Sequence, residues 1–106
     1  MVKIKVPQEI KLLTHTIKIR FDVKQVISQG TCGITRHLFQ DIILDNLTLP
    51  TSELNQVFLH EYIHVIERHF ALKLDDNDVE RLAEGLSVLL FDSLNIELDW
   101  VDIKEG

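Results

Sequence analysis

The spacing of apolar residues changes near residue 50, and this change constrains the fold more than any other feature of the sequence. Before it, the stretch TIKIRFDV (residues 16–23) alternates apolar with polar side chains. A period of two predicts a strand with one face in water. After it, apolar residues recur with the period of about 3.6 residues that is typical of helices. A chain of 106 residues fits one domain, so we predict a single α+β domain over residues 1–106.

Other short strands are expected in the N-terminal half. EIKLL is expected to pair with TIKIRFDV as a hairpin across Thr14 and His15, although the turn carries no Gly or Asn. QDIILDN is expected to be the more buried strand because Ile42, Ile43 and Leu44 are consecutive. With VKIKV and TCGITRHLF, these segments predict a small, mostly antiparallel sheet.

Two helices are expected to pack on this sheet. The first begins at Thr51 or Ser52, either of which can cap it, and runs without Gly or Pro to about Leu72. The second follows LDDND, with Asp75 or Asp76 as its cap. Its predicted apolar stripe consists of Val79, Leu82, Ala83, Leu86, Leu89, Leu90 and Leu94.

Composition excludes several classes of function. The net charge of −6 argues against binding to nucleic acid or to an anionic membrane surface, because both need a basic face. Cys32 is the only cysteine, which excludes an intrachain disulfide, and we expect it to be a small buried apolar residue. The sequence shows neither a signal peptide nor an apolar run of membrane-spanning length. These features favour a cytoplasmic protein.

The stretch FLHEYIHVIERHF (residues 58–70) carries the chemistry. His60 and His64 are four residues apart, so both lie on one face of the predicted helix and can bind one zinc ion. Glu61 is rotated by about 100° from His60, so it need not bind the metal. It can instead take a proton from zinc-bound water. The sequence thus predicts two zinc ligands and a general base within five residues.

A third protein ligand has to come from elsewhere. His69 lies about 140° around the helix from His64 and cannot join the same ion. Glu67 lies on the correct face but one turn too far, so it either orients a ligand or is solvated. The second helix offers Glu80 and Glu84. Glu80 lies on the border of the apolar stripe and is favoured, whereas Glu84 lies farther toward solvent.

Several other residues are given structural roles. Tyr62 falls within the apolar arc of the first helix, which favours core packing. His15 is expected in a turn, and His37 is expected to face outward from a strand beside Arg36. Ser87 shares the border of the second helix and could donate a hydrogen bond to the site.

The order of HEYIHVIERHF, an acidic turn and VERLAEGL resembles small zincin-like proteins that are often found in phage and prophage genomes. It is more distantly similar to ImmA/IrrE-type metallopeptidases. The resemblance implies strands before an active-site helix, Zn²⁺ as cofactor, His60, His64 and Glu80 as ligands, and Glu61 as base. It also implies a protein or peptide substrate and, for a phage-encoded member, the host cytoplasm.

The sequence therefore favours a zinc metallopeptidase, with two alternatives. In the favoured reading, an extended peptide adds to the edge of the sheet, which we expect to be QDIILDN, and water activated by Glu61 attacks its carbonyl. The first alternative is a non-catalytic or vestigial zinc-binding phage accessory or interaction protein, because a chain of this size has little room for a deep cleft. The second is an interaction domain without metal.

Overall fold

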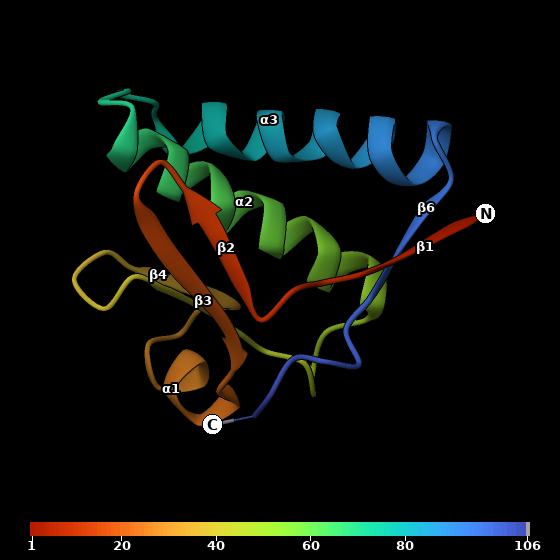
Figure 1. Ribbon diagram of the computed structural model, residues 1–106, viewed down its shortest axis with the longest axis horizontal. Coiled ribbons are helices and arrows are strands. Elements are labelled where there is room, and N and C mark those ends of the chain that lie inside the picture. Colours follow the sequence, from red (N-terminus) through yellow and green to blue (C-terminus); the bar gives the residue numbers. More distant parts are fainter. Residues whose placement is uncertain (106) are drawn as a thin grey trace.

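The computed structural model describes residues 1–105, and it shows an α+β fold with two small sheets and two long helices (Figure 1). Figure 1 shows α2 lying between the larger sheet and α3. The prediction of an α+β domain is confirmed. In chain order the elements are β1 (Val2–Lys5), β2 (Glu9–Leu12), β3 (His15–Phe21), α1 (Val23–Ser28), β4 (Gly33–Arg36), β5 (Asp41–Leu44), α2 (Thr51–His69), α3 (Asp76–Ser87), the π-helical η1 (Val88–Ser93) and β6 (Ile96–Asp99).

The larger sheet has the strand order β2-β3-β5-β4. β2 and β3 form the predicted antiparallel hairpin, and β4 is antiparallel to β5. β3 and β5 pair in parallel, with Ile19 opposite Ile42. The sheet is therefore mixed, although two of its three pairings are antiparallel. The predicted position of QDIILDN at the edge is wrong, because β5 pairs on both sides and the two edge strands are β4 and β2.

The two ends of the described chain meet in a second, two-stranded sheet. β1 pairs in parallel with β6, with Val2 opposite Ile96 and Ile4 opposite Leu98. Periodicity alone does not reveal this pairing, because the partners come from opposite ends of the sequence. Trp100, which follows β6, donates a hydrogen bond of 2.8 Å from Nε1 to Asn55 of α2. This bond anchors the C-terminal segment to the helix that carries HEYIH.

α2 is held on the sheet by the main core. Leu54, Phe58 and Val65 of the helix are buried with apolar residues from β3 and β5, and Tyr62 packs against the same cluster as predicted. Burial of each such side chain contributes about 1.5–3 kcal/mol. The helix begins after Pro50, without the predicted Thr or Ser side-chain cap. It ends at His69, before Ala71 adopts a φ of 55°.

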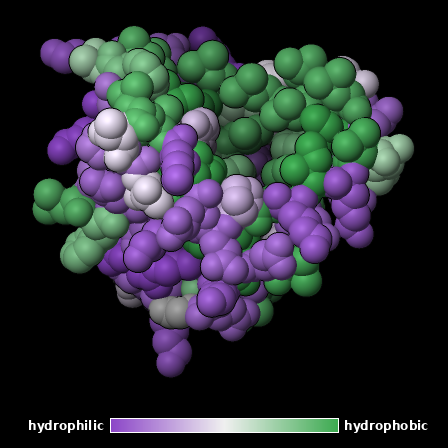
Figure 2. All heavy atoms as spheres, viewed as in Figure 1, coloured by the Kyte–Doolittle hydropathy of each residue, from purple (hydrophilic) through white to green (hydrophobic). Residues whose placement is uncertain are grey.

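α3 covers α2 with only a narrow part of its predicted stripe. Val79 and Ala83 are buried against Ile63 of α2, and Asp75 caps the helix by accepting a hydrogen bond from the backbone of Asp78. The remaining stripe is less covered than predicted, because no element within residues 1–105 packs on the outer side of α3 and η1. Large fractions of Leu82, Leu86, Leu89 and Leu94 are exposed. Figure 2 shows apolar side chains gathered along this upper edge of the molecule.

Two other features differ from the sequence prediction. The chain after β3 forms the short helix α1, capped by Asp22, and this helix begins at Val23, which was predicted to be the last residue of the strand. The helical region after Ser87 continues as η1 with π-helical hydrogen bonding, which changes the angular spacing of its leucines. No helix of residues 1–105 is long and apolar enough to cross a membrane.

Candidate metal centre and active site

The two histidines of HEYIH converge on one point. Their Nε2 atoms lie 3.3 Å apart, and the ring planes are inclined by 71°. Two nitrogens bound tetrahedrally to zinc at about 2.0–2.1 Å would lie roughly 3.4 Å apart. The same spacing also allows one neutral ring to donate a hydrogen bond to the other. The pair therefore already has the separation that two ligands of one zinc ion need.

A carboxylate fixes the orientation of the second histidine. Nδ1 of His64 lies 2.8 Å from Oε1 of Glu67, and Oε2 of Glu67 accepts a hydrogen bond of 3.2 Å from the backbone N–H of Leu74. A proton on Nδ1 leaves Nε2 free to bind a metal, which is the usual arrangement around metal-bound histidines. Of the two roles expected for Glu67, the structure shows the orienting one.

Glu61 is buried beside the histidine pair. Only 8% of the residue is exposed, and its Oε1 accepts a hydrogen bond of 2.9 Å from the hydroxyl of Thr35 on β4. The other oxygen, Oε2, lies 4.0 Å from Nε2 of His60. The contact with Thr35 leaves Oε2 directed toward the point where the two rings converge. Sequence spacing does not link Thr35 to Glu61, because the two residues are 26 positions apart along the chain.

The position of Glu61 depends on a close approach between α2 and β4. A Cβ atom on Gly33 would lie 2.7 Å from Cγ1 of Val57 and 3.1 Å from Cγ of Glu61. Contacts this short cannot be accommodated without movement. Gly33 therefore allows the edge strand to lie directly against the helix that carries the candidate base.

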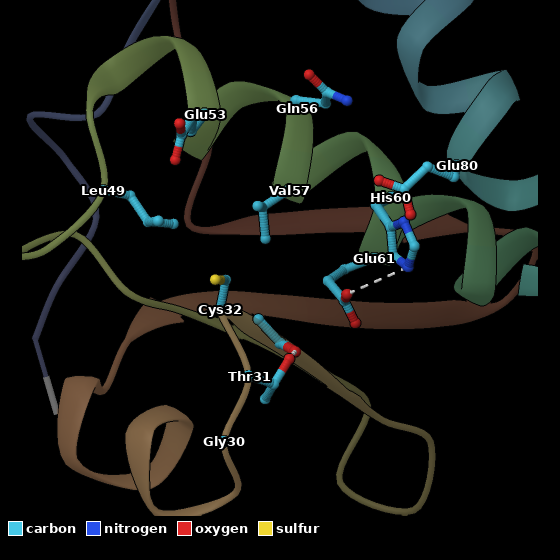
Figure 3. A pocket seen from close by; sticks show the side chains of 11 residues that line it. Gly30, Thr31, Cys32, Leu49, Glu53, Gln56, Val57, His60, Glu61 and Glu80 are labelled. Atoms are coloured by element: carbon cyan, nitrogen blue, oxygen red, sulfur yellow. Dashed lines mark hydrogen bonds and ion pairs between the residues drawn. The ribbon is translucent and has the colours of Figure 1, made fainter. Parts of the chain in front are cut away.

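A pocket of about 530 Å³ opens beside this point. Its walls are the loop before β4, the first half of α2 and one residue of α3 (Figure 3). Glu80 lines it together with His60 and Glu61, whereas Glu84 is not among the lining residues. Cys32 also lines it and is exposed, so the prediction of a buried Cys32 is wrong. Cys32 lies in the bend before β4 and lines the open pocket instead of the core.

The structure brings two of the three predicted ligands into direct contact. Within residues 1–105, no group of three or more His, Cys, Asp or Glu side chains is close enough to hold a metal ion. Glu80 reaches the pocket of His60 from α3 but is exposed. Two imidazoles and one carboxylate nonetheless form a donor set that suits zinc. The hydroxyl of Ser87, the predicted donor for the site, has no hydrogen-bond partner within residues 1–105.

The remaining histidines lie away from this point. His69 stacks on His15, with ring centroids 4.4 Å apart, in agreement with its exclusion from the ligand set. Partial burial and the nearby His15 and Arg68 lower the pKa of His69. His37 follows β4 in a turn, where loss of solvation and the neighbouring Arg68 lower its pKa. It is exposed as predicted, although not within a strand.

Comparison with known proteins does not identify a relative: no family model, curated protein or solved structure matches this chain.

Proposed function

We propose that the protein is a zinc-dependent metallopeptidase in which His60, His64 and Glu80 bind the metal and Glu61 is the general base. One observation carries the proposal. The two Nε2 atoms lie 3.3 Å apart, next to a buried carboxylate whose position is fixed by another element of the fold. A helix that only happens to contain several histidines would not need Thr35 of β4 to orient the neighbouring Glu61.

Each residue then has a defined role in hydrolysis. Zinc, when bound, would polarise a carbonyl and lower the pKa of water to about 7. Glu61 takes one proton from water through Oε2 as the water oxygen attacks the carbonyl carbon. The protonated carboxyl group returns this proton to the leaving nitrogen as the C–N bond breaks. Thr35 keeps the carboxylate in place throughout by its bond to Oε1.

The edge strand β4 offers a binding site for the substrate backbone. Asp45 donates a hydrogen bond to the carbonyl of Cys32, and Ile34 lies opposite Ile43 in the antiparallel register. Because hydrogen-bonded pairs alternate, the backbone groups of Gly33 and Thr35 point away from β5. An extended peptide can pair with them by strand addition beside Glu61. This proposal moves the expected binding edge from β5 to β4.

The variant Glu61→Gln tests the assigned base. We expect it to keep one zinc per chain, because the residue is not a ligand, and to lose proteolysis of fluorescently labelled, denatured casein. Metal content by elemental analysis and the rate of casein cleavage give the two readings. Cleavage by the variant at the wild-type rate would exclude Glu61 as base.

The third ligand has a separate test. Glu80→Ala should weaken zinc binding, measured by competition with a chelator, whereas Glu84→Ala should leave it unchanged, because Glu84 does not line the pocket. The opposite result would assign the ligand to Glu84.

A non-catalytic zinc-binding accessory protein is the second candidate function. The exposed leucines of α3 favour it, because Leu82 and Leu86 are one turn apart on the helix and 46% and 39% of these residues are exposed. X-ray absorption spectroscopy of the zinc-loaded protein separates the two. Four protein ligands indicate a closed structural site, and three with an open position indicate an enzyme. Absence of zinc from protein purified without added metal would instead indicate an interaction domain without metal.

A further inference from the structure

The pocket extends from the candidate metal centre along one side of α2. Glu53, Val57 and Glu61 are spaced four residues apart and therefore form a row on the helix. All three line the pocket. In Figure 3, Glu61 lies at one end of the hollow with His60 and Glu80, and Glu53 lies at the other end. The site therefore continues well beyond the atoms needed for hydrolysis.

The far end of this pocket carries a negative charge without a partner. The lining includes Glu53, Glu61 and Glu80 but neither Lys nor Arg. Glu61 accepts the hydrogen bond from Thr35, and Glu80 is the proposed ligand. Within the part of the chain that the structure describes, Glu53 has neither a hydrogen bond nor an ion pair. The negative charge of Glu53 is therefore the one that a bound substrate can neutralise.

The middle of the pocket is apolar. Val57 lies between the two glutamates of the row, and Leu49 faces it from the segment before α2 (Figure 3). Both residues are partly buried and pack against the main core, so their positions are fixed. An apolar substrate side chain would be favoured here, next to the acidic end.

The spacing of the row matches that of an extended peptide. Val57 and Glu53 are four residues apart on a helix, which corresponds to about 6 Å along its axis. Alternate residues of a strand lie on the same face and are separated by roughly 6.6 Å. An extended peptide that pairs with β4 and continues along α2 can therefore place one side chain against Val57. The side chain two residues farther along, on the same face of the peptide, then lies beside Glu53.

We propose that the pocket selects peptides in which an apolar and a basic residue are separated by one residue, so that the apolar side chain contacts Val57 and Leu49 and the Lys or Arg side chain pairs with Glu53. The proposal names the substrate class of the site and rests on the proposed function. From His60 to Glu53 the helix rises by about 10 Å, so the basic residue lies about three residues from the scissile bond.

Binding is measured on zinc-loaded Glu61→Gln protein, so that cleavage does not interfere. The probes are blocked octapeptides of Ala and Thr that contain one Leu and, before or after it at a spacing of one, two or three residues, one Lys, Gln or Glu. Fluorescence anisotropy of a neutral dye reports the dissociation constants. We expect Leu-x-Lys to bind roughly three- to fivefold more tightly than Leu-x-Gln, the range of a partly solvated ion pair.

Variants at the start of α2 identify the residue responsible. In the Glu61→Gln background, Glu53→Gln should remove the preference for Lys, and Glu53→Lys should reverse it in favour of Leu-x-Glu. Ser52→Lys is the matched control for Glu53→Gln, because it shifts the net charge of the first helical turn by the same single unit but lies outside the pocket lining. The control should keep the preference for Lys. Circular dichroism verifies that each variant retains its helices.

Equal affinity for Lys, Gln and Glu, independence of the spacing, or no binding of any peptide would overturn the proposal. A preference that persists in Glu53→Lys would also overturn it. Cleavage of the same peptides by the wild-type protein is scored separately. If peptides bind with the expected preference but none is cut, the peptidase function fails while the assignment of the pocket stands.

Discussion

Two pairs of histidines lie on or beside α2, and their geometries differ. His60 and His64 are one helical turn apart and direct their Nε2 atoms to one point. His15 and His69 come from different elements and stack face to face, with ring planes inclined by 29°. The first pair can share a metal ion, whereas stacked rings direct their nitrogens side by side and not toward a common centre.

The residues that contact the two pairs also favour metal binding only at the first pair. His64 contacts the carboxylate of Glu67, which orients the ring and favours a ligand role. His15 contacts the amide nitrogen of Gln40 at 3.3 Å, and His69 has the cation Arg68 nearby. Histidine content alone does not define a metal site; the direction of the nitrogens and the charge of the second contact do.

The largest expected effect separates the two pairs by zinc content. His60→Ala and His64→Ala each remove a proposed ligand, and we expect the loss of affinity to exceed the roughly 10- to 100-fold typical of an outer partner. His69→Ala should retain one zinc per chain. Elemental analysis after dialysis, followed by chelator competition, measures both quantities. Loss of zinc in His69→Ala together with its retention in His60→Ala would reverse the assignment.

The second prediction concerns the contact that orients His64 in the proposed metal-binding pair. Glu67→Ala leaves Nδ1 of His64 without its partner, and zinc affinity should fall by roughly 10- to 100-fold. The variant also frees the backbone N–H of Leu74, so the α2–α3 connection should become more mobile in hydrogen exchange. Glu9→Ala is a suitable control, because this glutamate is exposed on β2, away from the pocket. An unchanged affinity in Glu67→Ala would show that His64 needs no orienting partner.

The third prediction tests the close packing beside the proposed metal-binding pair. Gly33→Ala places a Cβ against Val57 and Glu61, and overpacking of this kind costs about 1–3 kcal/mol. We expect a lower free energy of unfolding in urea and a lower rate of casein cleavage. Gly85→Ala is the matched control. Its Cβ meets nothing within 4 Å, so removal of a helical glycine should stabilise the protein by roughly 0.5–1 kcal/mol.

The features that sequence reasoning predicted are those that depend on local spacing. The period of two located the β2–β3 hairpin, and the period of 3.6 located α2 and the start of α3. The i, i+4 spacing also placed His60 and His64 on one face of α2. Each of these follows from residues that are neighbours along the chain.

The features that it missed depend on contacts between distant segments. The parallel pairings of β3 with β5 and of β1 with β6 leave no local pattern. Thr35 could be linked to Glu61 only after β4 was placed against α2. The stripe of α3 predicted burial for leucines such as Leu82, but an apolar stripe specifies only which side of a helix avoids water. It does not specify how much of that side the rest of the chain covers.

The smallest expected effect is a pH dependence that arises from the stacked pair. Because the pKa of His69 is lowered in the folded protein, the unfolded chain binds more protons as the pH falls below about 6.5. The contribution of neutral His69 to the free energy of unfolding is therefore complete above that value and decreases as the pH falls toward the lowered pKa.

His69→Phe keeps an aromatic ring beside His15 but cannot be protonated, so its urea midpoint should decrease less between pH 7 and pH 5 than that of the wild type. Both proteins are measured in the same zinc-containing buffers, so that release of zinc and protonation of His37 contribute equally and the difference reports His69. Identical dependence of the urea midpoint on pH in the two proteins would show that protonation of His69 does not change the free energy of unfolding.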